Sequence, residues 1–162
     1  MGWVFFVELE LSCPAASWTE ITHLRAADTV LEAGWSGLAA KLERELAKDF
    51  TRGASFETVL RERYVDPERI FEVVERDGRT HVHVLALLDE SNLDQAFVLG
   101  ATMYAARARG GAGHLRFVND GAYFGDKGST LTLDEGAITR TTIVDHWEAS
   151  APMREALEQH VR

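Results

Sequence analysis

The clearest alternation of apolar and polar residues runs from residue 70 to residue 88 and surrounds Asp77-Gly78. Asp-Gly between two alternating segments is a strong signal for a β-hairpin. A two-residue loop fixes the register and places Glu72 opposite His83. One face of the hairpin is then apolar and predicted to be core, and it comprises Phe71, Val73, Val82, Val84, Ala86 and Leu88. The other face comprises Glu72, Val74, His81 and His83.

Other segments have the patterns expected of strands. Residues 3–11 alternate apolar with polar positions in their second half, and Pro14 ends this predicted strand. A short strand is predicted at 114–118. A second hairpin, rich in β-branched residues, is predicted from strands at 130–133 and 137–144.

Helices are predicted from apolar residues spaced by three or four positions. Ser17 and Glu20 have the spacing of a capping box, which predicts a long helix that begins there and ends at Gly53. Gly34 and Gly37 weaken its middle, so the alternative is two helices with a bend at 34–37. Shorter helices are expected at 55–64, from about 91 to 108, and from 150 onward. The apolar stripe of the long helix comprises Ile21, Leu24, Leu31, Trp35, Leu38, Leu42 and Leu46.

The order of these elements is a strand, a helical block, two strands, a helix, several strands and a final helix. Because strands and helices do not alternate strictly, a doubly wound parallel sheet is disfavoured. We predict an α+β fold, with an antiparallel or mixed sheet of about five to six strands and helices packed mainly on one face. No linker divides the chain, so residues 1–162 are expected to form a single domain.

Composition restricts the class of function. The net charge of −9 argues against nucleic acid as a direct partner and allows a basic protein partner. The apolar N-terminal segment contains Glu8 and Glu10 and lacks a basic start, unlike a secretory signal, and no stretch of about 20 apolar residues predicts a membrane span. The single cysteine, Cys13, is expected to be a buried thiol, so we predict a cytoplasmic protein. The oligomeric state stays open; Val4–Phe6 could pair between two copies if they lay at a sheet edge.

Two histidines of the first hairpin are the clearest candidates for chemistry. His81 and His83 share a face with Glu72, and two imidazoles with one carboxylate can bind zinc or iron. This set supports the hypothesis of a metal-dependent enzyme or metal sensor. The alternative is a half-exposed sheet face with a Glu72–His83 ion pair.

The glycine-rich segment 119–129 is the other candidate, because it presents aromatic residues among acidic ones. Such loops can form the centre of an interface with a basic protein. The alternative for this segment is two tight turns on either side of a very short strand. The leading hypothesis is therefore a non-catalytic acidic protein-binding domain without a cofactor, such as an immunity protein that neutralises a toxin or enzyme. The predicted partner-binding residues are Asp89, Glu90, Asp120, Tyr123, Phe124, Asp126, Asp134 and Glu135.

A small-ligand-binding regulatory domain is the third hypothesis. Its pocket would lie between the sheet and the long helix, near Trp18, Trp35 and Trp147. Tryptophans at these positions are also compatible with an ordinary core.

Overall fold

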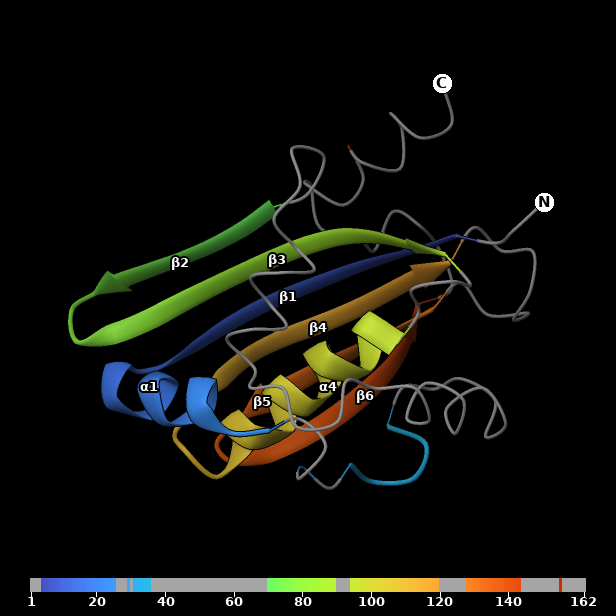
Figure 1. The fold of residues 1–162 in the computed structure, drawn as a ribbon. Coiled ribbons are helices and arrows are strands. Elements are labelled where there is room, and N and C mark those ends of the chain that lie inside the picture. Colours follow the sequence, from blue (N-terminus) through green and yellow to red (C-terminus); the bar gives the residue numbers. More distant parts are fainter. Residues whose placement is uncertain are drawn as a thin grey trace.

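The computed structural model describes residues 4–25, 29, 31–35, 70–89, 94–119, 128–143 and 155. Six strands form one sheet, and two helices pack beside it (Figure 1). The elements are β1 (Val4–Pro14), α1 (Ala15–His23), β2 (Ile70–Arg76), β3 (Arg79–Asp89), α4 (Asp94–Arg107), β4 (Ala112–Asn119), β5 (Gly128–Asp134) and β6 (Ala137–Ile143).

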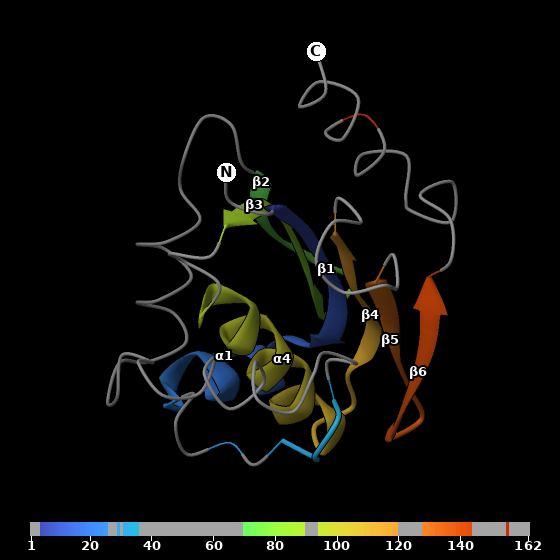
Figure 2. The ribbon, with the colours of Figure 1, turned by 90° about the vertical axis from the view of Figure 1, so that its right-hand side faces the viewer.

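The strand order is β2-β3-β1-β4-β5-β6, and every neighbouring pair is antiparallel. Both helices lie on one face of the sheet (Figure 2). The predicted α+β fold, with an antiparallel sheet and helices on one face, is therefore confirmed. Since β1 pairs with β3 on one side and with β4 on the other, Val4–Phe6 do not lie on an edge strand.

Both predicted hairpins form, and their turns explain why. Asp77 and Gly78 have φ angles of 55° and 76°, and Glu135 and Gly136 have 49° and 78°. Two successive positive φ angles match the right-handed twist of antiparallel strands, which is why such turns connect hairpins. The predicted register is confirmed, with Glu72 opposite His83.

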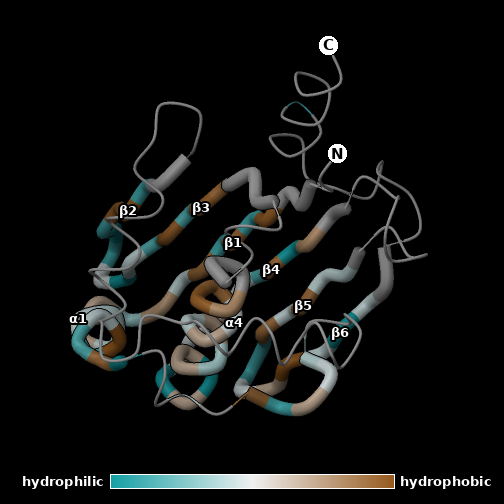
Figure 3. The backbone as a smooth tube through the Cα atoms, turned by 45° about the vertical axis from the view of Figure 1, so that its right-hand side comes forward, coloured by the Kyte–Doolittle hydropathy of each residue, from teal (hydrophilic) through white to brown (hydrophobic). Residues whose placement is uncertain are grey.

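The core lies between the sheet and the two helices. Hydrophobic and hydrophilic residues alternate along β1 from Val7 onward (Figure 3), and Val7, Leu9, Leu11 and Cys13 are buried. Cys13 is buried there, as predicted, and burial raises the pKa of its thiol, although the positive charge of Arg79 partly offsets this effect. The largest fully buried side chains are Phe117, Leu9, Ile21, Leu99, Met103, Leu115 and Leu131.

The edge strand β2 departs from the predicted core. Val73 is 43% exposed, although it shares the helix-side face with the buried Val82 and Val84. Because β2 has only β3 as a neighbour, its helix-side residues have less surrounding structure than those of the central strands. The side chains of Phe71, Ala86 and Leu88 lie outside the described residues.

The long helix predicted from Ser17 is wrong in its start and does not continue past His23. Its predicted part at 36–53 and the helix predicted at 55–64 lie outside the described residues, as does the helix predicted from 150 onward except for residue 155. Helix α1 begins at Ala15 after Pro14, no side chain caps its first turn, and it ends at His23. Leu24 is extended, and His23 Nδ1 lies 2.7 Å from the carbonyl oxygen of Thr19, which caps the last turn. By contrast, the helix predicted from about 91 to 108 is confirmed by α4, apart from its exact start. No helix among the described residues is long and apolar enough to span a bilayer.

Candidate functional site

The sheet face opposite α1 and α4 carries polar residues in rows that cross four strands. The register places Glu72, His83, Glu10 and His114 side by side in one row. The adjacent row consists of Val74, His81, Ser12 and Ala112. Two residues along a strand span about 7 Å, which is the spacing of these rows.

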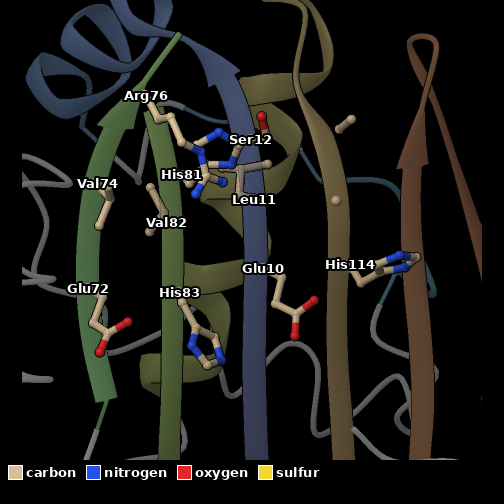
Figure 4. Close-up of a pocket in the computed structure, with 12 residues that line it drawn as sticks. Glu10, Leu11, Ser12, Glu72, Val74, Arg76, His81, Val82, His83 and His114 are labelled. Carbon is tan, nitrogen blue, oxygen red and sulfur yellow. The ribbon is translucent and has the colours of Figure 1, made fainter. Parts of the chain in front are cut away.

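A pocket of about 440 Å³ lies over these two rows. Figure 4 shows its labelled ionisable side chains on the side of the sheet that faces the viewer, with helix ribbon behind the strands. The pocket is therefore on the opposite face from the one predicted for a ligand near Trp18 and Trp35. Trp35 belongs to the core, Trp18 packs against it, and Trp147 lies outside the described residues. The lining comprises Glu10, Leu11, Ser12, Glu72, Val74, Arg76, His81, Val82, His83, Ala112, Gly113 and His114.

Glu8 is the buried charge beside this pocket, and its side chain is 0% exposed. His83 Nε2 lies 2.8 Å from Glu8 Oε2, and Arg116 Nη1 lies 3.4 Å from Glu8 Oε1. The same Arg116 atom lies 3.9 Å from Glu10 Oε1. A buried carboxylate needs such partners, because the loss of hydration is otherwise costly. Each oxygen of Glu8 thus faces a different basic side chain.

The hydrogen bond to Glu8 raises the pKa of the His83 imidazole above its ordinary value. Burial acts in the opposite direction, and the negative charges of Glu8, Glu10 and Glu72 add to the increase. Since the His83 side chain is 25% exposed, this imidazole still has contact with solvent while its Nε2 is held by Glu8. The environment favours the protonated form of His83 when no other cation is bound.

Three donor side chains converge at this position. One carboxylate oxygen each from Glu8 and Glu10 and one ring nitrogen of His83 all lie within 4.8 Å of one another. Carboxylate and imidazole are ligands that suit zinc and other divalent transition metals. We call Glu8, Glu10 and His83 the carboxylate–imidazole centre.

The set His81, His83 and Glu72, predicted from the sequence, is only partly brought together. All three side chains line the pocket, but only His83 belongs to the carboxylate–imidazole centre. The ion pair considered for Glu72 and His83 is replaced by the hydrogen bond from His83 to Glu8 on β1. The alternation of Glu8 and Glu10 was visible in the sequence, but only the strand order shows that β1 lies beside β3.

The predicted partner-binding residues are described only in part. Asp134 and Glu135 are exposed at the turn between β5 and β6. Asp89 is the last residue of β3, and its side chain is outside the described set. The remaining predicted interface residues, which are Glu90, Asp120, Tyr123, Phe124 and Asp126, lie outside the described residues.

The function of this chain has to be inferred from the geometry of the site, because comparisons with known proteins found no match. The chain matches no protein-family model, no curated protein and no solved structure.

Proposed function

We propose that this protein binds one divalent transition-metal ion at the carboxylate–imidazole centre, at the edge of the pocket. The observation that carries the proposal is the convergence of donor atoms from Glu8, Glu10 and His83 within 4.8 Å. Donor atoms on one tetrahedral zinc ion are about 3.3 Å apart, so small side-chain rotations would suffice. The three ligands come from two hydrogen-bonded strands, with Glu8 and Glu10 on β1 and His83 on β3.

Arg116 supports this assignment instead of opposing it. Its guanidinium lies at Glu8 Oε1, whereas His83 lies at Oε2. A metal ion between His83 Nε2 and Glu8 Oε2 would replace the proton that these atoms share. Arg116 would then remain as the partner of the second carboxylate oxygen, the kind of outer contact that orients metal ligands.

Three protein ligands leave a coordination position for water or a ligand. The centre borders the pocket through Glu10 and His83, so that position would face the pocket. A bound ion lowers the pKa of a coordinated water, which would suit either a hydrolytic enzyme or a sensor that exchanges the water for a ligand. This retains the metal hypothesis derived from the sequence and changes two of its three ligands.

Zinc titration of the EDTA-treated protein tests the proposal. We expect one equivalent of zinc by calorimetry and by elemental analysis after desalting. Glu8→Gln, Glu10→Gln and His83→Gln should each weaken binding by about tenfold or more. Glu72→Gln and His81→Gln serve as controls, because these residues line the pocket but lie outside the centre. Binding that disappears in the controls and persists in Glu10→Gln would instead support the set predicted from the sequence, and no binding would refute both.

An acidic protein-binding domain of the immunity type is the second candidate. The observation that favours it is the exposed pair Asp134 and Glu135 at a hairpin turn, in a chain with a net charge of −9. Exposed acidic residues increase the rate at which a basic partner associates. A double variant, Asp134→Asn with Glu135→Gln, should slow association with a basic partner and reduce its salt dependence, as measured by surface plasmon resonance. An unchanged association rate would argue against a role for this turn.

A further inference from the structure

The end of the pocket away from the carboxylate–imidazole centre is rich in hydrogen-bond donors. His81 on β3 lies opposite Ser12 on β1, and Arg76 is next to this row at the end of β2. All three side chains line the pocket. Figure 4 shows Arg76 extending from β2 toward His81. We call Arg76, His81 and Ser12 the donor end.

Arg79 fixes the role of the Ser12 hydroxyl. The Nε atom of Arg79 donates to Ser12 Oγ at 2.9 Å, and its Nη2 donates to the carbonyl oxygens of Ser12 and Gly110. A serine oxygen that accepts from a guanidinium still has its own O–H to donate. The adjacent positive charge strengthens that donor, because charge-assisted hydrogen bonds are the stronger ones.

The other two donors are uncommitted within the described part of the chain. Neither Arg76 nor His81 makes a hydrogen bond or an ion pair with another described residue. A guanidinium, an imidazole N–H and a hydroxyl at one end of a pocket form a set that suits an anionic oxygen group.

We propose that the donor end is a subsite for the carboxylate or phosphate group of a small ligand, whose other end reaches the carboxylate–imidazole centre. His81 and Ser12 lie one row, or roughly 7 Å along the strands, from His83 and Glu10, and Arg76 lies one row further away. A short dicarboxylate or a phosphorylated metabolite can span the distance from the row of His81 and Ser12 to the centre. The second half of this proposal rests on the proposed metal function, whereas the anion subsite does not require a metal.

Anion binding to the metal-free protein tests the subsite directly. The probes are inorganic phosphate and succinate, followed by calorimetry and by amide chemical shifts of Ser12 and His81 in the presence of EDTA. We expect saturable binding that Arg76→Gln weakens by about tenfold, with a smaller loss in Ser12→Ala. Arg140→Gln, which removes an exposed charge on β6 outside the pocket lining, should leave the affinity unchanged.

The zinc-treated protein separates this inference from the proposed function. If succinate binds the metal-free protein but zinc does not bind, the subsite stands and the metal function fails. If zinc binds but neither succinate nor inorganic phosphate saturates the metal-free protein up to about 20 mM, the subsite is overturned. Equal anion affinity for the original chain and for Arg76→Gln would also overturn it. Tighter succinate binding with zinc, lost in Glu10→Gln, would support a ligand that bridges both ends.

Discussion

The two faces of β1 bury neighbouring residues for different reasons. Leu9 and Glu8 are both fully buried, one on the helix side and the other on the pocket side. Leu9 is stabilised by apolar contacts, which depend on area and not on direction. Glu8 is stabilised by directed contacts, among them those with His83 and Arg116, so its burial depends on particular partners. The comparison teaches that two equally buried residues of one strand can have different roles. On one face of the sheet the buried residue belongs to the hydrophobic core, and on the other it belongs to the candidate site.

The largest effect is expected from Leu9→Ala on the helix-side face. Removing a fully buried leucine side chain leaves a cavity, and we expect the free energy of unfolding to fall by about 3 kcal/mol. Urea denaturation of the metal-free protein measures this value. Glu10→Ala, one residue along the strand and 44% exposed, is the matched control and should cost less than about 1 kcal/mol. Equal losses of unfolding free energy in the two variants would contradict the assignment of the core to the helix-side face.

A smaller loss is expected from Glu8→Gln on the pocket side. The substitution preserves shape but removes the charge that faces His83 and Arg116, and the expected cost is about 2 kcal/mol in the absence of metal. The same denaturation experiment provides the measurement, with Glu10→Gln as the control for loss of a nearby charge. An unchanged stability in Glu8→Gln would contradict a stabilising role for the charged contacts of Glu8 with His83 and Arg116.

The pH dependence of stability sharpens the same point. The folded-state pKa of His83 is raised, chiefly by its hydrogen bond to Glu8, so the protonated imidazole stabilises the fold. This contribution is complete below the ordinary histidine pKa of about 6.5 and is lost as the pH rises through the higher folded value. The charged groups near His83 among the described residues include Glu8, Glu10 and Glu72, all of which raise its pKa. Arg116 is also nearby and forms an ion pair with Glu8.

His83→Gln should therefore cost more stability at pH 5.5 than at pH 8.5, when unfolding is measured in urea with EDTA. His81→Gln controls for the removal of an imidazole from the same pocket. A cost for His83→Gln that does not decrease with rising pH would contradict the role of the Glu8 hydrogen bond.

Much of the fold follows from local pattern, whereas the site depends on the strand order. The Asp77-Gly78 turn fixes the pairing of β2 with β3, so the position of Glu72 opposite His83 could be predicted. The pairing of β1 with β3 joins residues about 75 positions apart, and no turn encodes it. Hence the sequence placed His83 on a polar face but could not identify Glu8 as its partner.

The error in the first helix has a different origin. The apolar stripe continues beyond residue 24, but Leu24 is extended and Gly34 has a φ angle of 78°, so the chain leaves the helical conformation. The side chains of Thr22 and His23 both contact the carbonyl oxygen of Thr19 near the end of the helix, and such local contacts compete with continuation of the helix. Periodicity alone therefore overestimated the helix, because Leu31 and Trp35 reach the core from outside α1.

The smallest effect is expected at Val73, and it compares two valines on the same face of one hairpin. Val84 is fully buried on β3, whereas Val73 is 43% exposed on the edge strand β2. Val84→Thr buries a hydroxyl in the core and should cost about 2 kcal/mol, whereas Val73→Thr should change stability by less than about 0.5 kcal/mol. Urea denaturation at two protein concentrations measures both variants. If Val73→Thr costs as much as Val84→Thr, and more at high concentration, then this edge is covered by a second copy and its exposure in the single chain is misleading.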